Sequence, residues 1–201
     1  LVSSSAASDV YKRQHQQSAI YSQKDNLGLI KLHGKTLSYN NYNDVFSALS
    51  ITKSFPKNVG TVIIKHANPC GVSILKDKLR SYKSALACDP LSAFGGVVSC
   101  NFKVSKSLAL ELNKIFFEVI IGNGFEKNAV KILKAKKNLR LIDASKFSLD
   151  KNLRFNSINT SVLIQSEDNK IFQKKNFRVV SKKKPSKSQF ENLIFAFNIC
   201  R

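Results

Sequence analysis

Short runs of β-branched residues alternate with segments of helical periodicity along most of this chain, and this alternation restricts the fold more than any other feature. The runs lie at 61–65, 96–100, 118–121, 139–142 and 161–165. Runs rich in Val and Ile are typical of buried strands. Strands that alternate with helices pack as layers, with helices covering a central sheet. The sequence therefore predicts an α/β fold with a layered architecture.

Four amphipathic helices are predicted between and after the strands, because apolar residues recur there at a spacing of three or four. The predicted stripes, in chain order, are Leu79, Tyr82 and Leu86; Leu108, Leu112, Ile115 and Phe116; Ala129, Ile132 and Leu133; Phe190, Leu193, Ile194 and Phe197. The first helix is expected to stop at Asp89-Pro90. Residues 188–191, Ser-Gln-Phe-Glu, have the pattern of a capping box, which predicts the start of the fourth helix.

The formal net charge of +20 comes from 33 Lys and Arg residues against 13 Asp and Glu. A basic chain attracts nucleic acids and small anionic substrates alike, so the charge does not separate these partners. The lysines are scattered through every segment and accompany many Asn and Ile residues, which favours a compositional bias over a selected basic surface. RNA-binding, zinc-finger and helix-turn-helix signatures are absent from the sequence. Nucleic acid is therefore not the expected partner.

The apolar runs and the cysteines indicate the compartment. Runs such as 62–64 and 119–121 are far shorter than the roughly 20 residues that span a bilayer. We therefore expect a soluble, cytoplasmic protein with no membrane partner. The four cysteines are Cys70, Cys88, Cys100 and Cys200. Their wide spacing, without a CxxC pair, favours small buried thiols over a disulfide framework or a zinc site.

Residues 1–14 differ in composition from the rest of the chain. They are rich in Ser and Ala and lack periodicity, so we interpret them as a non-native scar and exclude them from the fold. A transit peptide, the alternative for a Ser-rich start, needs an amphipathic repeat that is missing here. The remaining residues, 15–201, are sufficient for one domain with a real core.

The motif Lys-His-Ala-Asn-Pro-Cys-Gly occupies 65–71, directly after a predicted strand. A strand end followed by a turn with Pro and Gly places polar side chains at the rim of an α/β sheet, where ligands commonly bind. A single His is more often structural than catalytic, but the adjacent Lys65 disfavours the imidazolium form of His66. A neutral His66 is able to accept a proton near pH 7, as a general base does.

A second motif, Asp-Pro-Leu-Ser-Ala-Phe-Gly-Gly, occupies 89–96. Paired glycines allow a backbone to approach a ligand closely, and Phe94 can lie against a planar ring. An ordinary turn before the strand at 96–100 explains the same residues equally well on the sequence alone. The segment is therefore a candidate binding loop.

These two motifs resemble those of the AICAR formyltransferase family, which has Lys-His-x-Asn-Pro-Cys-Gly, then Asp-Pro-x-Ser-Ala-Phe-Gly-Gly, then Phe-x-Glu-Val-Ile-Ile. The third motif is present at 116–121, and the order and intervals agree. Residues 15–17, His-Gln-Gln, are similar to the end of an upstream family element, and 37–41, Leu-Ser-Tyr-Asn-Asn, to another. Downstream, 182–185, Lys-Lys-Lys-Pro, and the predicted fourth helix also fit. The resemblance covers about residues 15–200.

The resemblance implies both a function and a fold. Family members transfer a formyl group from 10-formyltetrahydrofolate to AICAR, a step in IMP biosynthesis, without a metal. The implied fold is a layered α-β-α arrangement, similar to that of cytidine deaminases, in a homodimer with sites near the subunit interface. His66 then takes the place of the general base, and Lys65 that of the residue stabilising the developing oxyanion. The implied substrate-binding residues are Asn41, Phe94, Gly95 and Glu118.

The resemblance further implies that the chain is the N-terminal part of this domain, cut short at both ends and without the IMP cyclohydrolase domain. Residues 12–14, Lys-Arg-Gln, depart from the family's Arg-Tyr-Gly-x-Asn-Pro, so Arg13 is not expected to bind phosphate. The family's Ser-Asn element is expected beyond Arg201. The 201 residues alone are therefore expected to be inactive.

Two rival functions are weighed against this one. A zinc deaminase, suggested by the shared fold, needs His-x-Glu followed by Pro-Cys-x-x-Cys. Here Asn68 stands two residues after His66, and Ser73 stands three after Cys70, so no metal is expected. The other rival is a basic nucleic-acid-binding fragment without catalysis, and salt-dependent RNA binding that AICAR leaves unchanged favours it.

Overall fold

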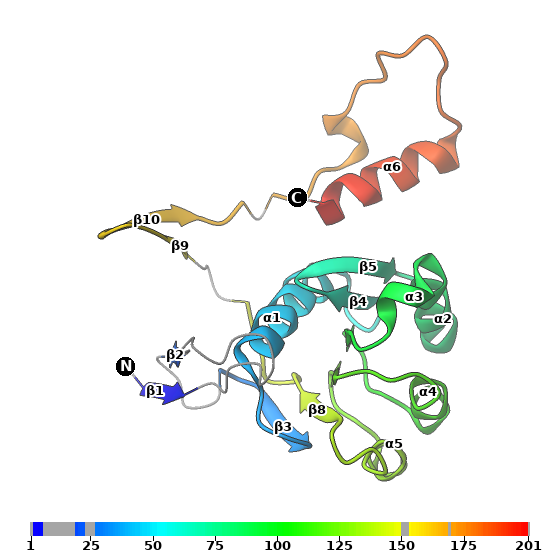
Figure 1. Ribbon diagram of the computed structural model, residues 1–201. Helices are drawn as coiled ribbons and strands as arrows, with labels where there is room; N and C mark the ends of the chain where they lie inside the picture. The colour runs from blue at the N-terminus through cyan, green and yellow to red at the C-terminus, as the bar shows by residue number, and fades with distance from the viewer. Residues whose placement is uncertain (1, 6–18, 23–26, 150–152, 169, 201) are drawn as a thin grey trace. The chain divides into compact units, whose positions relative to one another are not determined.

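The computed structural model describes residues 2–5, 19–22, 27–149, 153–168 and 170–200 (Figure 1). The chain forms two compact units, Leu1–Leu149 and Asp150–Arg201, which are described separately. In the first, β1 (Val2–Ser5) pairs antiparallel with β2 (Ala19–Ser22), so the beginning of the segment interpreted as a scar forms a strand. The rest of that segment and the His-Gln-Gln element at 15–17 lie outside the described residues.

A six-stranded sheet forms the centre of the first unit. Its strands are β3 (Ile30–His33), β4 (Thr61–Lys65), β5 (Asn68–Ser73), β6 (Val97–Cys100), β7 (Val119–Gly122) and β8 (Arg140–Asp143). Their spatial order is β3-β8-β7-β6-β4-β5. The β6–β7 and β7–β8 pairs are parallel, whereas β3, β4 and β5 pair antiparallel with their neighbours. The first four predicted strands therefore lie side by side in one sheet.

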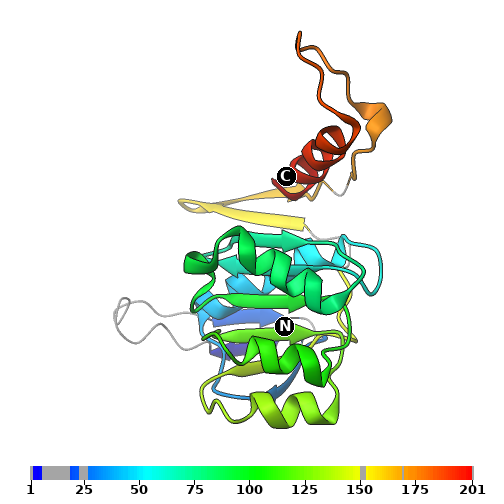
Figure 2. The same ribbon diagram turned by 90° about the vertical axis from the view of Figure 1, so that its right-hand side faces the viewer.

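Helices cover both faces of this sheet (Figures 1 and 2). They are α1 (Tyr39–Lys53), α2 (Lys78–Cys88), α3 (Pro90–Ala93), α4 (Lys106–Leu112) and α5 (Lys127–Leu133). Val45 of α1 shares one apolar cluster with Val62 of β4, while Tyr82 of α2 shares a second cluster with Ile63. Neighbouring strand residues point to opposite faces, so the sheet separates two cores. The predicted layered α/β fold is confirmed.

The helices α4 and α1 differ from the prediction. The helix α4 ends at Leu112, so Ile115 and Phe116 follow it and do not extend its stripe. Ile115 still packs against the core from the connecting loop, which explains its apolar character without helical backbone. The helix α1 was not predicted, because its first turns are rich in Asn, a poor helix former.

The second unit consists of a hairpin, a short 3-10 turn and a helix. These elements are β9 (Leu153–Ile158), β10 (Ser161–Ser166), η1 (Lys174–Asn176) and α6 (Lys187–Cys200). The predicted strand at 161–165 is β10, but it pairs antiparallel with β9 in a separate hairpin and not with the central sheet. The rings of Phe172, Phe177 and Phe197 pack together with centroids 5.2 to 6.0 Å apart.

The start of α6 corrects the predicted capping box. Ser186 Oγ accepts a hydrogen bond from the Gln189 amide, and Gln189 Oε1 accepts one from the Ser186 amide. The box therefore lies two residues before the predicted one at 188–191. Both quartets fit the same pattern of Ser followed three residues later by Gln or Glu, so the pattern alone does not choose between them.

The cysteines are all free, and their burial differs. Cys100 is buried and Cys70 partly buried, whereas Cys88 and Cys200 are exposed. The prediction of buried thiols is therefore wrong for Cys88 and Cys200, which are the last residues of α2 and α6 and lie at exposed helix ends. Among the residues that the structure describes, no helix has the length and apolarity needed to cross a membrane.

Candidate active site

The first predicted motif is built around a tight hairpin turn. The strand β4 ends at Lys65, which pairs with Asn68 at the start of β5. The two residues between them, His66 and Ala67, have φ values of 52° and 62°. Positive φ at both central residues is the pattern of a type I′ turn, whose twist matches that of the flanking strands. His66 therefore stands in the turn directly after Lys65, the last residue of β4.

The predicted position of this turn is wrong, because Pro69 and Gly71 lie within β5. The strand β5 is at the edge of the sheet, where a proline is tolerated. Gly71 fits there for a packing reason: a Cβ at this position overlaps the carbonyl oxygen of Ala85 in α2. Pro and Gly therefore mark an edge strand close to a helix.

Lys65 joins the two predicted motifs directly. Its Nζ donates to the carbonyl oxygens of Phe94 at 3.0 Å and Gly95 at 3.1 Å. Gly95 has a φ of +69°, and a Cβ there lies 3.0 Å from Lys65 Nζ. A glycine is thus suited to this position by backbone conformation and by the approach of the lysine. The loop at 89–96 is held against the end of β4.

Phe94 is presented on the surface of this loop. Its side chain is 62% exposed, and its ring lies 5.4 Å from that of Phe116, centroid to centroid. The loop begins with α3, where Asp89 accepts hydrogen bonds from the Ser92 amide and hydroxyl. These bonds lower the pKa of Asp89. Because Asp89 caps α3, the exposed ring projects from an ordered turn.

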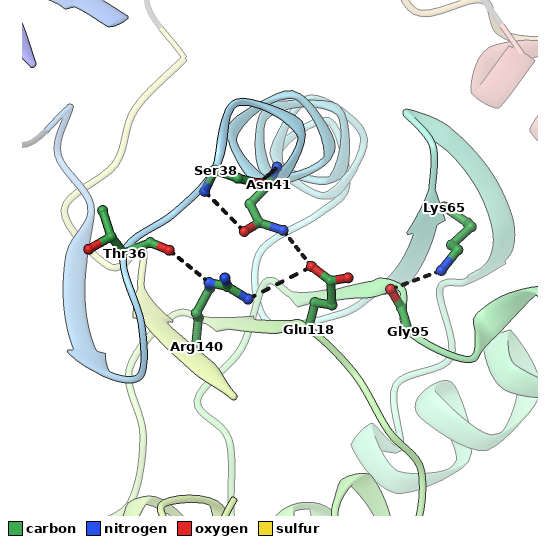
Figure 3. A network of polar contacts seen from close by, with 7 residues as sticks. All are labelled: Thr36, Ser38, Asn41, Lys65, Gly95, Glu118 and Arg140. Atoms are coloured by element: carbon green, nitrogen blue, oxygen red, sulfur yellow. Dashed lines mark hydrogen bonds and ion pairs between the residues drawn. The ribbon is translucent and has the colours of Figure 1, made fainter. Parts of the chain in front are cut away.

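The carboxylate of Glu118 is the centre of a second polar group (Figure 3). Asn41 Nδ2 of α1 donates to Glu118 Oε2 at 2.7 Å. Arg140 Nη1, at the start of β8, lies 3.7 Å from the same oxygen. Asn41 is only 3% exposed, so this contact also satisfies a buried amide. Two elements, α1 and β8, therefore contribute partners to one carboxylate.

Both partners of Glu118 make further hydrogen bonds that hold their side chains in place. Asn41 Oδ1 accepts the Ser38 amide at 3.1 Å while the Asn41 amide donates to Ser38 Oγ, which forms the capping box of α1. Arg140 Nε donates to the Thr36 carbonyl oxygen at 3.1 Å. The side chain of Asn41 thus serves the helix with its oxygen and Glu118 with its nitrogen.

Asp44 also belongs to this site, although the sequence reasoning omitted it. Its Oδ1 accepts the amide of Ala67 at 2.7 Å. Burial raises the pKa of Asp44, whereas the Ala67 bond and the charge of His66 lower it; Glu118 raises it and Lys65 lowers it. Asp44 is therefore within electrostatic reach of all three ionisable candidates.

The omitted residues carried signals in the sequence. Asp44 follows Asn41 by three positions, so a helix there puts both on one face. Arg140 interrupts the otherwise apolar run at 139–142, and a charge at the start of a buried strand needs a partner. Neither signal points to a site on the sequence alone, because the pattern does not predict α1 and the run at 139–142 is typical of a strand.

Most of the predicted site residues lie where β4 ends and where β6 and β7 begin, which is the same end of these strands. Because β4 is antiparallel to β6, Lys65 lies near the residues that precede β6, and Glu118 precedes β7. The Glu118 amide donates to the Gly96 carbonyl oxygen, which links the two groups. The site therefore lies at the amino ends of the parallel strands, whereas ligands of open α/β sheets usually bind at the carboxyl ends.

The arrangement combines an ammonium group, an exposed imidazole, an exposed aromatic ring and a carboxylate braced by an amide. Among the described residues His66 is linked to the others through its chain neighbour Lys65 and through the charge of Asp44. An ammonium group can stabilise a developing anion, and an imidazole can move a proton. No three His, Cys, Asp or Glu side chains within the described ranges are grouped so as to hold a metal ion.

Comparison with known proteins finds relatives that are named for purine biosynthesis. It is 37% identical over 191 residues to the bifunctional purine biosynthesis protein PurH of Clostridium kluyveri, which covers 93% of this chain. The PurH of Bacillus cereus is 38% identical over 172 residues, or 85% of the chain. That of Prochlorococcus marinus is 38% identical over 205 aligned positions, or 95% of the chain.

These alignments cover only part of each relative. The chain spans 38% of the length of the Clostridium kluyveri protein, 34% of the Bacillus cereus protein and 40% of the Prochlorococcus marinus protein. The model of the AICARFT/IMPCHase bienzyme family matches residues 12–201. Because this match extends over nearly all of the sequence, the chain belongs to the AICARFT/IMPCHase bienzyme family.

Proposed function

We propose that this chain acts in purine biosynthesis as part of an enzyme that transfers a formyl group from 10-formyltetrahydrofolate to AICAR. Lys65 and His66 are the catalytic pair, and Asn41, Phe94, Gly95 and Glu118 bind the substrate. The observation that carries the proposal is the contact of Lys65 Nζ with the Phe94 and Gly95 carbonyl oxygens, which unites the two motifs. Membership of the AICARFT/IMPCHase bienzyme family supports the proposed reaction class.

The proposed roles follow from the chemistry of formyl transfer. The AICAR amine attacks the formyl carbon, so a C–N bond forms and the carbonyl oxygen becomes an oxyanion. His66 takes the proton that the amine loses and returns it to N10 of the folate as the C–N10 bond breaks. An ammonium group has three N–H donors, and Lys65 uses two on carbonyl oxygens. The third is left for the oxyanion.

The substrate-binding roles follow from the geometry of the other residues. The exposed ring of Phe94 suits stacking on a planar imidazole, and the Glu118 carboxylate suits hydrogen bonding to hydroxyl groups. Asn41 orients that carboxylate through its 2.7 Å bond. We further propose a homodimer that acts in the cytoplasm and uses the folate as a co-substrate, with no metal required for the transfer.

The test is the rate of formyl transfer by the whole gene product that contains these residues. His66→Ala is expected to lower kcat by about a hundredfold or more, because proton abstraction is lost. Lys65→Ala is expected to have an effect of similar size, because the oxyanion loses its ammonium partner. The affinity for AICAR should change less than the rate. The rate of tetrahydrofolate release, followed by absorbance at several AICAR concentrations, gives kcat and the KM for AICAR of each variant.

Matched controls separate chemistry from folding. Lys76→Ala removes an exposed lysine on the loop after β5, and His33→Ala removes a histidine of β3 that contacts the Lys136 carbonyl oxygen. Both controls should keep near-normal turnover. A variant at Lys65 or His66 that formylates AICAR at the parent rate removes that residue from the catalytic pair. The 201-residue chain, assayed in parallel, shows whether it is active alone.

A further inference from the structure

The turn that carries His66 has a backbone conformation that its residues do not favour. His66 and Ala67 both have positive φ, at 52° and 62°. A left-handed conformation is costly for a residue with a Cβ, and alanine has no polar side chain to offset it. The Ala67 amide also lies in the turn, outside the strand pairing. Such a turn needs support from a neighbouring element.

The helix α1 supplies this support through Asp44. The Asp44 carboxylate accepts the Ala67 amide at 2.7 Å, a short contact for a charge-assisted hydrogen bond. It reaches the turn across 23 residues of sequence, from a different layer of the fold. Burial raises the pKa of Asp44, and the amide bond is the largest influence that lowers it. The bond to the turn thus favours the charged carboxylate in a partly buried place.

The same face of α1 also contacts Glu118, one of the proposed substrate-binding residues. Asn41 lies one turn earlier and donates to Glu118 at 2.7 Å. The helix is opened by the capping box of Ser38 and Asn41, which fixes its first turn. A displacement of α1 therefore moves two groups together: the Asn41 amide that contacts Glu118 and the Asp44 carboxylate that contacts the Ala67 amide.

We infer that Asp44 is a positioning residue of the active site, which holds the turn of His66 and Ala67 in its left-handed conformation and so aims His66 at the substrate. This inference rests on the proposed function of His66. It assigns Asp44 no contact with the substrate. Its role is to fix the base, in the way that bound groups must be oriented before a reaction proceeds.

The first experiment measures the hydrogen bond between the Ala67 amide and Asp44 in the 201-residue chain. Amide exchange at Ala67 is followed by NMR in the parent, Asp44→Ala, Asp44→Asn and Asp77→Ala. Asp44→Ala should speed exchange at Ala67 about tenfold or more, because its acceptor is lost. Asp44→Asn keeps an acceptor oxygen and should be slower than Asp44→Ala. Asp77→Ala is the control, since Asp77 Oδ1 also accepts a backbone amide at 2.7 Å, that of Arg80.

The second experiment measures catalysis in the whole gene product. Asp44→Ala is expected to lower kcat about tenfold or more with little change in KM for AICAR, because orientation and not binding is lost. Asp44→Asn should recover part of the rate, whereas Asp77→Ala should match the parent. Recovery by Asn separates the loss of the hydrogen bond to the Ala67 amide from a general loss of structure, which each variant's melting temperature also monitors.

The outcomes separate this inference from the proposed function. Unchanged exchange at Ala67 in Asp44→Ala, or an unchanged kcat, overturns the positioning role even when His66→Ala is inactive. A fully active His66→Ala variant overturns the proposed catalytic pair. It also removes the catalytic role of the hydrogen bond between Asp44 and the Ala67 amide. Fast exchange at Ala67 together with a lowered kcat, both partly restored by Asn, supports the inference.

Discussion

The two units of this chain build their strands in opposite ways. In the first, β6 and β7 are buried at every residue, because helices cover both faces of the central sheet. In the second, β9 and β10 are exposed at every residue, and α6 has no buried residue. Yet β7 and β10, Val-Ile-Ile-Gly and Ser-Val-Leu-Ile-Gln-Ser, each contain three consecutive apolar residues. Similar strand sequences therefore have different surroundings.

The difference shows that apolar β-branched sequence alone does not produce a stable strand. Burial of a side chain such as Ile stabilises a fold by about 1.5 to 3 kcal/mol, whereas an isolated two-stranded hairpin is marginal in water. The stability of the first unit should thus come from its sheet and helices. The candidate active site lies in that unit, where such a framework fixes side chains precisely.

The largest expected effect is a difference in amide exchange between the two units. Amides of β6 should exchange at least about 10³-fold more slowly than those of β10, because they open only with the core. Hydrogen–deuterium exchange followed by mass spectrometry measures both strands in one sample. Equal protection of β10 and β6 contradicts the comparison and means that the hairpin is stabilised as strongly as the sheet.

A matched pair of isoleucines tests the same contrast by mutation. Ile63→Ala in β4 should lower the free energy of unfolding of the first unit by about 2 to 5 kcal/mol, since Ile63 is fully buried. Ile164→Ala in β10 should change it by less than about 0.5 kcal/mol, since Ile164 is 60% exposed. Urea denaturation decides between these values.

The tyrosines make that measurement specific. The chain has five tyrosines and no tryptophan, and every tyrosine lies at or before Tyr82. Intrinsic fluorescence therefore reports on the first unit, where Tyr82 is buried. A loss of several kcal/mol from Ile164→Ala in this signal shows that the two units depend on each other. A neutral Ile63→Ala argues against the packing of β4.

A smaller effect is expected at the two hairpin turns. Ala67→Gly should raise the stability of the first unit by roughly 0.5 to 1 kcal/mol, because glycine relieves the left-handed strain but loses more entropy on folding. Asn159 in the β9–β10 turn also has positive φ, at 50°, which Asn tolerates well. Asn159→Gly should therefore change the exchange of the hairpin amides little. Destabilisation by Ala67→Gly speaks against strain at this turn.

The smallest effect concerns pH. Burial raises the pKa of Asp44 above its usual 3.8, so the folded state binds this proton more tightly than the unfolded state. The contribution of Asp44 to stability is therefore highest below pH 3.8 and falls as the pH rises through its folded pKa. The Asp44→Asn variant should lack this fall. Urea denaturation between pH 3.5 and 6 compares the two proteins, and parallel curves contradict the assignment.

Local patterns in the sequence predict most of the candidate site residues. The motifs predict Lys65, His66, Phe94, Gly95 and Glu118 as candidates, and in the structure Lys65 Nζ donates to the Phe94 and Gly95 carbonyl oxygens. What the motifs did not give was the position of the turn. Pro and Gly usually mark turns, but here they fit an edge strand under α2.

The helix α1, which carries Asn41 and Asp44, was missing from the prediction. Its first residues, Tyr-Asn-Asn-Tyr-Asn-Asp, have low helix propensity, so periodicity gives a weak signal. The helix forms because a capping box opens it and because Val45, Ala48 and Leu49 are buried against the sheet. The sequence pattern does not single out Asp44 for this reason, although its carboxylate accepts the Ala67 amide in the turn after β4.

The sequence by itself determined the alternation of strands and helices, the family motifs and the identity of the candidate catalytic residues. These features depend on the type and spacing of nearby residues, which a single chain displays directly. The tertiary structure alone decided which side chains meet. Asn41 and Glu118 are 77 residues apart, and Lys65 and Gly95 are 30 apart. Their contacts form because burial of the two cores fixes strand order and helix position, and distances along the chain do not encode that outcome.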